Sequence, residues 1–541
     1  MECTAYPRPL QTWLQQYMDE ATPMRQWYDY MPQQEEDWKA RADWLDQAVH
    51  LRADRRQLVE VLRAYNTRIA QSDLAMKQIE ALQDPQTLVV IGGQQAGLLT
   101  GPMMVIYKAL TIIHTAREAE KRLDRKVVPV FWVAGEDHDF EEVHVTEILS
   151  PSGETVRIAL DRELSSGQSV SDIPIPQAHW DQVLEQLDGA LLDTEFKPDI
   201  MARLRHIHAS SSDLSEAFSR ILAWLFQDYG LVLMDAADPQ LRELESDMFV
   251  SLVQQQQPLS EALMQQAARL QSEGFALQAE PEAHAAHLFY QHENGRKLLF
   301  AEGEVFTDRK HTFQLSRTEL EDIARQSPQK LSNNVFTRPL MQEFLLPVLG
   351  AVLGPAEIAY WGMLKPAFHL QDMRMPLLIP RQEFTLVEGT VQKHLRKYGL
   401  EAADIVERFA DKREAWLREQ DSLQVEERFT DAKKQFQEMY APLVEMLQEI
   451  HPGIYKLGQT NLQKIQEQIE FLSQKAQDAD QSRHTAALRQ WDKMKMSLHP
   501  HDKYQERVYN VFAYLNKYGL KWLEELMSTP YSKSLHHWIY L

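Results

Sequence analysis

The amino-acid sequence predicts an α/β fold built on a parallel sheet, followed by an antiparallel α-helical coiled coil. Residues 88–91 and 126–134 are continuous apolar runs, which are typical of strands buried on both faces. A predicted helix of about 20 residues separates them, so they form a β–α–β unit with a right-handed crossover. Toward the C-terminus, apolar residues recur every three or four positions along two arms that flank 451–453.

The net charge, the apolar runs and the cysteine count limit the location and the partners of the protein. Its 57 Lys and Arg residues against 79 Asp and Glu residues give a net charge of −22, which argues against nucleic-acid and anionic-membrane partners. No apolar run approaches the roughly 18 residues that span a bilayer, and the N-terminus lacks the pattern of a signal peptide. The single cysteine, Cys3, excludes an intrachain disulfide, so we expect a cytoplasmic protein.

Further elements follow from the same periodicities. Apolar residues at helical spacing predict further helices, and short β-branched runs bounded by turn residues predict further strands. The expected elements are helices over 1–84 and 183–226, a hairpin over 144–160, a third buried strand ending at Asp235, an antiparallel pair within 284–308 that turns at 293–295, and a last strand over 375–381.

These elements predict three parts of the chain. The α/β core occupies 1–385 and carries the N-terminal helices and two inserted lobes, at about 150–225 and 240–330. An α-helical coiled-coil hairpin follows over 386–500, and the aromatic-rich helices of 501–541 return to the core. Because arms of this length keep an apolar face, we expect a homodimer.

The first predicted strand ends in a glycine-rich turn that leads into a helix. Gly92-Gly93, Gly97 and Gly101-Pro102 follow the strand, and proline fits the first helical position because its missing N–H costs nothing there. A strand, a glycine turn and a helix N-terminus can bring backbone N–H groups to an anion. The spacing matches no standard nucleotide motif. The turn is therefore either an anion site or an ordinary β–α turn whose glycines serve packing.

The second predicted strand leads into a dense ionisable cluster, Gly135-Glu-Asp-His-Asp-Phe-Glu-Glu-Val-His144. Ligands of open α/β sheets bind beyond the carboxyl ends of the strands, where both this cluster and the glycine turn lie. If a helix starts here, His138, Glu141 and Glu142 share a face. The acidic residues cap that helix, or the histidines bind a metal, or the carboxylates hold an ammonium group beside His138 as acid or base. The spacing of His138 and His144 disfavours the metal.

A third polar group follows from two later helix starts. Arg338 and Gln342 share a face of one predicted helix, and Glu357, Tyr360 and Trp361 share a face of the next. Arginine offers a planar fork to a carboxylate or phosphate, and the aromatic rings offer flat walls. The two aromatic residues are also explained as core residues. Arginine on a buried helix needs an anionic partner, which favours a site.

Several longer strings carry a resemblance to a known family. They are Ile91-Gly-Gly-Gln-Gln-Ala-Gly-Leu-Leu-Thr-Gly-Pro102, Val130-Phe-Trp-Val-Ala-Gly-Glu-Asp-His-Asp139, Arg338-Pro339, Gly354-Pro-Ala-Glu-Ile-Ala-Tyr-Trp361, Leu364-Lys-Pro366, Gln505-Glu-Arg507 and Leu515-Asn-Lys-Tyr-Gly519. In these strings the chain resembles the cysteine-adding enzymes of bacillithiol biosynthesis, the BshC family. The resemblance extends over the whole chain.

The resemblance implies a fold and a reaction. The fold is a Rossmann-like core with inserted connecting segments and a C-terminal coiled coil used for dimerisation, with an adenine-nucleotide site (ATP or ADP) beside the coiled coil. The reaction is a last biosynthetic step, in which a ligase joins L-cysteine to glucosaminyl-malate through an amide bond. No metal is expected. Because a free carboxylate does not acylate an amine unaided, the carboxyl group of cysteine is expected to be activated first.

The candidate site residues fall into three sets. The catalytic candidates are Glu136, Asp137, His138 and Asp139, with His138 as the base that deprotonates the attacking amine. The substrate-binding candidates are Gly93, Gln94, Gln95, Thr100, Gly101, Lys108, Asn334, Arg338, Gln342, Glu357, Tyr360 and Trp361. The nucleotide-binding candidates are Arg381, Phe384, Arg489, Lys503, Tyr504 and Arg507, which are basic or aromatic and near the predicted seam.

Two other functions remain open. One is a metal-dependent hydrolase or deacetylase that acts on a glucosaminyl conjugate. The other is a non-catalytic scaffold organised by the coiled coil. The polar clusters at the sheet edge argue against a scaffold, which needs no Glu-Asp-His-Asp sequence there.

Overall fold

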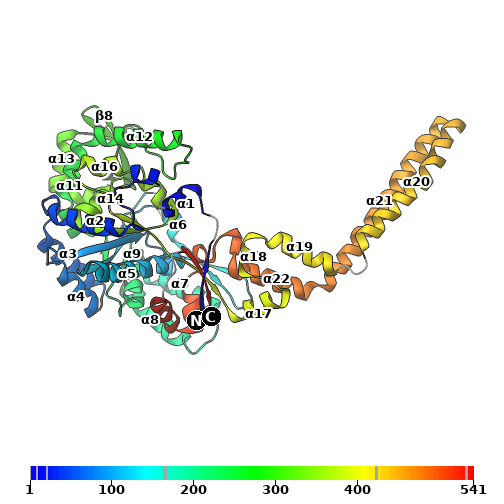
Figure 1. Cartoon of the computed structure of the whole chain (residues 1–541), viewed down its shortest axis with the longest axis horizontal. Helices are drawn as coiled ribbons and strands as arrows, with labels where there is room; N and C mark the ends of the chain where they lie inside the picture. The colour runs from blue at the N-terminus through cyan, green and yellow to red at the C-terminus, as the bar shows by residue number, and fades with distance from the viewer. Residues whose placement is uncertain are drawn as a thin grey trace. The chain divides into compact units, whose positions relative to one another are not determined.

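The computed structural model divides into two compact units (Figure 1). The first unit comprises 1–385 and 506–539, and the second comprises 386–505 and 540–541. The structure describes residues 2–7, 10–19, 22–161, 167–293, 295–420, 424–529 and 534–541. Asn294, in the predicted turn at 293–295, lies outside these residues.

A five-stranded parallel sheet forms the centre of the first unit. In spatial order its strands are β13 (Leu377–Pro380), β12 (Val348–Leu353), β2 (Leu88–Gln94), β3 (Val127–Val133) and β6 (Val232–Asp235). Every neighbouring pair is parallel. All residues of β3 and β6 are buried, as their continuous apolar runs predict. The predicted α/β fold with a parallel sheet is confirmed.

Strand β12 is missing from the sequence-based prediction. Its apolar run contains Pro347 and Gly350, two residue types that commonly interrupt regular structure. In the sheet, Pro347 precedes the strand, and the pairing with β2 shifts register between Val348 and Gly350. A Cβ on Gly350 would lie 3.3 Å from Ile379 of β13, so this position fits only a small residue without adjustment.

Helices cover both faces of the sheet. Val89 and Ile91 pack in the same core as Leu58 and Leu62, whereas a Cβ on Gly92 would lie 2.8 Å from the side chain of Ile112 on the opposite face. The helices are α1 (Thr12–Met18), α2 (Glu35–Gln47), α3 (Arg55–Arg68), α4 (Asp73–Ala81) and α5 (Met104–Leu123). The N-terminal helix α3 therefore covers the face opposite α5, which is the crossover helix between β2 and β3.

Two lobes are inserted into the α/β core. The first, between β3 and β6, contains α6 (Phe140–Val143), the hairpin of β4 (Val145–Leu149) and β5 (Thr155–Ala159), α7 (Gln177–Ala190), α8 (Lys197–Ala209) and α9 (Leu214–Leu225). The second, between β6 and β12, begins with α10 (Pro239–Leu244), α11 (Ser246–Gln254) and α12 (Gln256–Ser272).

The second lobe adds its own antiparallel sheet in the order β10-β9-β8-β7-β11. Its elements are β7 (Ala285–His292), β8 (Gly295–Glu302), β9 (Val305–Thr307), β10 (Gln314–Ser316), α13 (Arg317–Gln326) and β11 (Leu331–Asn333). In Figure 1 this lobe is drawn in green, with β8 at its upper edge near α12. The predicted antiparallel pair within 284–308 is part of this sheet.

The rest of the first unit returns to the central sheet. It consists of α14 (Arg338–Leu345), α15 (Pro355–Trp361), α16 (Lys365–Leu370), α23 (Phe512–Tyr518), α24 (Lys521–Ser528) and a small sheet in the order β1 (Glu2–Tyr6), β15 (His536–Tyr540) and β14 (Glu383–Val387). Asn510 donates from Nδ2 to Leu99 O at 2.8 Å and to Gly101 O at 2.7 Å. The C-terminal segment therefore holds the glycine turn.

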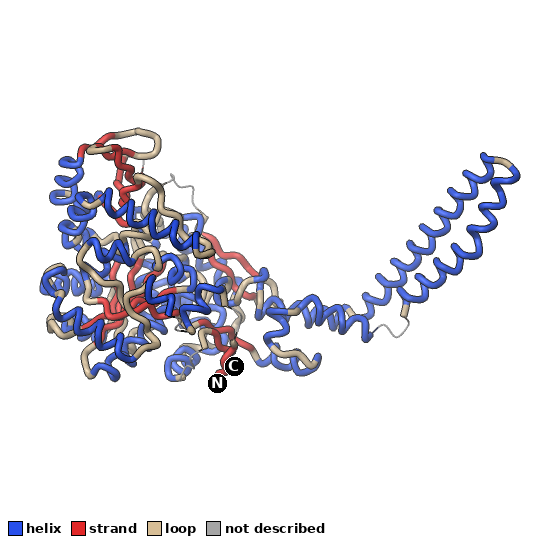
Figure 2. Tube along the Cα trace, turned by 45° about the horizontal axis from the view of Figure 1, so that its top comes forward, coloured by secondary structure: helices blue, strands red, loops and turns tan. Residues whose placement is uncertain are grey.

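The second unit is helical. Its helices are α17 (Gly389–Tyr398), α18 (Ala402–Glu407), α19 (Phe409–Gln420), α20 (Val425–Ile450), α21 (Pro452–Arg483) and α22 (Thr485–Leu498). Figure 2 shows α20 and α21 side by side, which confirms the predicted coiled-coil hairpin. A Cβ on Gly458 would lie 3.0 Å from Leu447, so the arms approach closely there. Among all helices within the described ranges, none is long and apolar enough to cross a membrane.

Candidate functional site

The carboxyl ends of β2 and β3 bring the glycine turn and the acidic cluster together. The two strands stay in parallel register to their last residues, and the Ala134 N–H donates to Gln94 O at 3.0 Å. Just beyond them, Gln95 donates from Nε2 to Asp137 Oδ2 at 2.6 Å. Two of the polar groups that the sequence marks therefore meet at the edge where ligands of α/β sheets bind.

Close backbone approaches explain the glycines of the turn. A Cβ on Gly93 would lie 2.6 Å from Trp132 O, and one on Gly97 would lie 3.0 Å from Gly101 Cα. Gly101 has a φ of 68°, in the left-handed region that favours glycine. Thr100 is buried, and its Oγ1 has no hydrogen-bond partner among the described residues. Packing therefore accounts for the glycines, and an anion-binding role for the turn stays a prediction.

Lys108 is buried beneath the turn. Its Nζ donates to Gly93 O at 2.7 Å, to Gln94 Oε1 at 3.3 Å and to Glu357 Oε2 at 2.7 Å. Burial lowers the pKa of Lys108, and the carboxylate of Glu357 opposes that shift. An ammonium group has three hydrogens to donate, and these three protein acceptors therefore use all of the hydrogen bonds that Nζ can donate. Lys108 therefore anchors the turn to α15.

Helices α14 and α15 bring two predicted residues together. Arg338 donates from Nη2 to Tyr360 Oη at 3.3 Å. Burial opposes the charge of Arg338, but Tyr360, Glu357 and Glu136 raise its pKa overall. The positive charge of Arg338 therefore acts together with the other polar groups at this edge. Trp361 is 3% exposed and belongs to the hydrophobic core, which favours its interpretation as a core residue.

Asn334 and Gln342 have different surroundings from Arg338. Asn334 Oδ1 accepts from the backbone N–H groups of Phe336 at 2.9 Å and Thr337 at 3.2 Å, which shapes the loop before α14. Gln342 is buried on α14. Asn334 thus has a local structural role, and direct substrate contact by either residue stays a prediction.

The acidic cluster contains a helix cap, as one interpretation predicts. Asp139 Oδ1 accepts from the Glu142 N–H at 3.3 Å at the start of α6. Because α6 begins only after Asp139, His138 precedes the helix. The expectation that His138 shares a helical face with Glu141 and Glu142 is therefore wrong.

Asp137 and His138 lie beside Arg296 of β8. Asp137 accepts from Gln95 and from the backbone N–H groups of His138 and Asp139. Burial raises the pKa of Asp137, but the hydrogen bond from Gln95 and the charge of Arg296 bring it below its usual value. His138 Nδ1 lies 3.2 Å from Arg296 Nη1. Burial and the charge of Arg296 lower the pKa of His138, so its ring is neutral at pH 7.

The contact with Arg296 determines the tautomer of His138. Arginine only donates hydrogen bonds, so Nδ1 accepts and the hydrogen of the neutral ring lies on Nε2. The His138 side chain is 40% exposed. It therefore offers an N–H donor to a ligand, and its expected role as a base requires Arg296 to release Nδ1.

Arg296 is a site residue that the sequence analysis misses. It donates from Nε to Ser332 Oγ and from Nη2 to Asn333 O, both at 2.7 Å, and its guanidinium carbon lies 3.8 Å from the centre of the Phe289 ring. Burial lowers its pKa. One signal in the sequence was available. Arg296 follows a predicted hairpin turn and occupies a strand position, and a charged residue buried in a strand needs hydrogen-bonding or anionic partners.

Glu136 is bound by a second cation that the sequence does not mark. Its Oε2 pairs with Arg242 Nη2 of α10, and Arg242 also donates from Nη1 to Glu245 Oε2 at 2.8 Å. Glu136, Arg242 and Glu245 are all buried. The cluster after β3 is therefore held by residues from the second lobe, 106 positions further along the chain.

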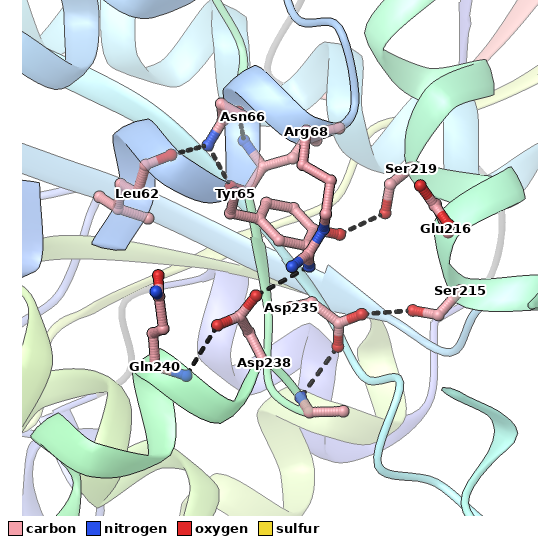
Figure 3. A network of polar contacts seen from close by, with 12 residues as sticks. Leu62, Tyr65, Asn66, Arg68, Ser215, Glu216, Ser219, Asp235, Asp238 and Gln240 are labelled. Carbon is pink, nitrogen blue, oxygen red and sulfur yellow. Dashed lines mark hydrogen bonds and ion pairs between the residues drawn. The ribbon is translucent and has the colours of Figure 1, made fainter. Parts of the chain in front are cut away.

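Asp235, the last residue of β6, is held by a network of hydrogen bonds (Figure 3). Ser215 donates from Oγ to Asp235 Oδ2 at 2.5 Å, and the Ala237 N–H donates to Oδ1 at 2.9 Å. A Cβ on Gly135 would lie 2.5 Å from Asp235 Oδ1, so a larger residue there would have to displace this carboxylate. Burial raises the pKa of Asp235 to about 6. Asp235 is at the predicted functional edge, but its contacts give it a structural role.

Two nucleotide-binding candidates are engaged within the first unit. Arg381 donates to both carboxylate oxygens of Glu506, at 2.9 and 2.6 Å, and Phe384 packs against Tyr107 with ring centres 4.9 Å apart. Both are buried, and their role in nucleotide binding stays a prediction. Arg507 of the first unit is exposed.

The remaining nucleotide candidates belong to the second unit. Arg489 and Lys503 are exposed, and Tyr504 is half-buried. Their role in nucleotide binding stays a prediction. Among the side chains that the structure describes, no group of three or more His, Cys, Asp or Glu residues is arranged to hold a metal ion.

Comparison with known proteins identifies the family over the full length. Residues 1–382 match the family described as bacillithiol biosynthesis BshC, N-terminal Rossmann-like domain, and residues 384–541 match its C-terminal coiled-coil domain. A relative from a Geobacillus species is 36% identical over 530 residues, which cover 97% of both chains. One from Bacillus cytotoxicus is 37% identical, over 90% of this chain and 91% of the relative.

A third relative, from Symbiobacterium thermophilum, is 34% identical over 91% of this chain and 92% of its own. All three are named "Putative cysteine ligase BshC". The match of both family domains confirms the Rossmann-like core and the coiled coil that the resemblance implies. The chain belongs to the BshC family of bacillithiol biosynthesis, to which these relatives named putative cysteine ligases also belong.

Proposed function

We propose that this protein is a ligase that adds L-cysteine to glucosaminyl-malate by forming an amide bond, the last step of bacillithiol biosynthesis. One observation carries the proposal: the 40% exposed His138 lies at the carboxyl edge of the parallel sheet, with its Nδ1 3.2 Å from Arg296 Nη1 and 3.7 Å from Asp137 Oδ1. The cysteine-ligase names of the relatives support the choice of cysteine as one substrate.

The charged groups of the site suit the two substrates. Asp137 holds the ammonium group of cysteine, because its carboxylate is ionised and 29% exposed. Arg338 orients a carboxylate of the malate moiety of the second substrate, since its charge is retained beside Tyr360. The two charges thereby hold both substrates at the same edge of the sheet, and such positioning is the main contribution an enzyme makes to a condensation of this kind.

His138 acts on the bond-forming step through its Nε2 hydrogen. The amine nitrogen attacks the activated carboxyl carbon of cysteine, the C–N bond forms, and the bond to the activating group breaks. The Nε2 hydrogen donates to the carbonyl oxygen as negative charge develops there. The proton that the amine loses departs with the activating group. The alternative, in which His138 takes this proton, is the role expected from the sequence.

An adenine nucleotide is the proposed source of the activating group. The residues that would bind it are those expected from the sequence. An assay by mass spectrometry with glucosaminyl-malate and cysteine, run with and without ATP, tests both the reaction and this requirement. We expect the amide product when ATP is present. Absence of the product under both conditions would overturn the proposed ligase activity.

The same assay separates the ligase from its main rival. A metal-dependent hydrolase or deacetylase would consume a glucosaminyl conjugate without cysteine, and added chelator would stop it. We expect no loss of glucosaminyl-malate when cysteine is omitted. Consumption without cysteine, restored by a divalent metal after chelation, would favour the hydrolase.

We further propose a homodimer formed through the coiled-coil hairpin of this cytoplasmic enzyme. Large apolar side chains on both arms are exposed: Met439, Leu443, Met446, Ile450, Ile454, Leu457, Phe471 and Leu472. Light scattering should give the mass of a dimer for the natural chain and of a monomer for a Leu443→Glu, Leu457→Glu variant. Gln463→Glu, which adds a charge at a polar position of α21, is the control. A natural chain that is monomeric at all concentrations would contradict the proposal.

A further inference from the structure

Arg242 of α10 lies between two buried carboxylates. Its Nη2 pairs with Glu136 Oε2 beyond the end of β3, and its Nη1 donates to Glu245 Oε2 at 2.8 Å. The side chains of Arg242, Glu136 and Glu245 are only 4%, 7% and 0% exposed. Phe249 of α11 lies 5.8 Å from the guanidinium carbon and contributes apolar surface beside it.

The two carboxylates are compensated to different degrees. Glu136 faces a second cation besides Arg242, because Arg296 also attracts it. Glu245 has only the shared Arg242, and its Oε1 has no hydrogen-bond partner among the described residues. A fully buried carboxylate with so little compensation is costly to ionise. A proton therefore belongs on Glu245 rather than on Glu136.

The electrostatic surroundings of Glu245 support this assignment. The charged groups that act on it are Arg242 of α10 and Glu136 from the loop after β3. Asp172 of the first lobe and Arg296 of β8 interact with Arg242. Burial is the dominant effect and raises the pKa of Glu245 to about 7, although Arg242 opposes it.

We propose that Glu245 is a positioning residue, which as a neutral carboxylic acid holds Arg242 so that the guanidinium fixes the Glu136 carboxylate at the edge of the sheet. Glu245 itself is fully buried, so it acts only through Arg242. When Glu245 loses its proton, a second anion competes with Glu136 for the same cation, and Glu136 is held less firmly. The effect on turnover rests on the proposed function; the protonation of Glu245 does not.

Substitutions separate a neutral Glu245 from a charged one. Glu245→Gln keeps an acceptor for Arg242 and imitates the neutral acid, whereas Glu245→Ala removes the support. We expect kcat at pH 7 to fall about 10- to 100-fold in Glu245→Ala, and Glu245→Gln to recover most of that loss. The natural chain should also lose activity as pH rises through about 7, and Glu245→Gln should not. Equal losses in Glu245→Gln and Glu245→Ala would overturn the proposal.

A second measurement needs no substrate. Because the pKa of Glu245 is raised in the folded protein, the folded state binds more protons than the unfolded state between the ordinary glutamate pKa of 4.5 and about 7. The stability from this group is full below that window and is lost as pH rises through it. The Tm of Glu245→Gln minus that of the natural chain should therefore increase between pH 5 and pH 8. A difference that stays constant with pH would contradict a proton on Glu245.

Glu343→Gln is the matched control for the kinetic measurement. Glu343 is also a buried carboxylate with arginine partners, but both its oxygens are paired, with Arg41 and Arg52. We expect this variant to lose stability and to keep the pH profile of kcat. If no variant and no natural chain forms product, the proposed ligase fails, while the Tm measurement still decides the state of Glu245.

Discussion

Two buried clusters of the first unit are made of the same two residue types in opposite proportion. Around Glu343, two arginines share one carboxylate: Arg41 lies 2.5 Å from Oε2 and Arg52 lies 2.9 Å from Oε1. Around Arg242, two carboxylates share one arginine, and one oxygen of Glu245 has no partner among the described residues.

The proportions suit different tasks. Arg41 also donates to the carbonyl oxygens of Val348 and Arg374. It thereby ties α2 to the start of β12 and to the loop before β13. The surplus carboxylate at Arg242 has no such use. It lies beside the predicted catalytic residues, where perturbed ionisable groups are concentrated in enzymes. The Glu343 cluster, in which both carboxylate oxygens are paired, stabilises the fold. The Arg242 cluster, in which one oxygen of Glu245 is unpaired among the described residues, is able to change its protonation with pH.

Removing the arginine of each cluster should give the largest effects and break the comparison most directly. In Arg242→Met, Glu136 and Glu245 lose their shared partner, and we expect the free energy of unfolding to fall by about 3–5 kcal/mol. In Arg41→Met, Arg52 still pairs with Glu343, so the loss should be smaller. Urea denaturation followed by tryptophan fluorescence measures both. A larger loss in Arg41→Met would contradict the assigned roles.

Substitution of His138 should reduce turnover without unfolding the protein. We expect kcat to fall about 100-fold in His138→Ala, corresponding to about 2.7 kcal/mol. His138→Gln keeps an N–H donor but cannot act as a base, so it should retain more activity if the Nε2 hydrogen is what matters. His144→Ala is the control, since His144 contacts Phe140. If His138→Gln and His138→Ala are equally inactive, the base role is favoured.

The pH dependence of turnover should sharpen the same point. Burial and Arg296 lower the pKa of His138 below its ordinary value of 6.5. The neutral ring is therefore present at pH 7, and on the acid side activity should fall at pH values below 6.5, where protonation puts a hydrogen on Nδ1 and breaks the contact with Arg296. A profile of kcat/KM against pH tests this. The acid limb should disappear in His138→Gln, and its persistence there would assign it to another group.

Gln95→Ala should give the smallest of these effects. Gln95 donates to Asp137, whose carboxylate keeps the two backbone donors of His138 and Asp139. Loss of one such hydrogen bond is worth about 1 kcal/mol, or roughly a fivefold fall in kcat/KM. Gln57→Ala, at an exposed position of α3, is the control. A fall as large as that of His138→Ala would show that Gln95 contacts the substrate itself.

The sequence predicts most of the central sheet because its signals are local. Continuous apolar runs mark β2, β3, β6 and β13, and the acidic cluster follows directly from the end of β3. Strand β12 is missed because proline and glycine interrupt its run. The mistake matters, since β12 lies between β13 and β2 and thereby determines the spatial order of the sheet.

The cations of the site could not be predicted in the same way. Arg242 and Arg296 come from the inserted second lobe, and their partners Glu136 and His138 lie 106 and 158 positions away. The sequence position of a single arginine on a helix or strand does not identify the distant residue that it contacts in the fold. The sequence therefore marks the acidic cluster, Lys108 and Arg338, and leaves out the two arginines of the second lobe.

The contact of Asn510 with the glycine turn has a consequence for biosynthesis. Its two hydrogen bonds to Leu99 O and Gly101 O join residues 411 and 409 positions apart. A ribosome that has made the whole α/β sheet has not yet made Asn510, because the coiled coil is translated first. The turn between β2 and α5 is thus left without its anchor until the coiled coil has been made. The site is finished only after the segment that follows the coiled coil has been translated.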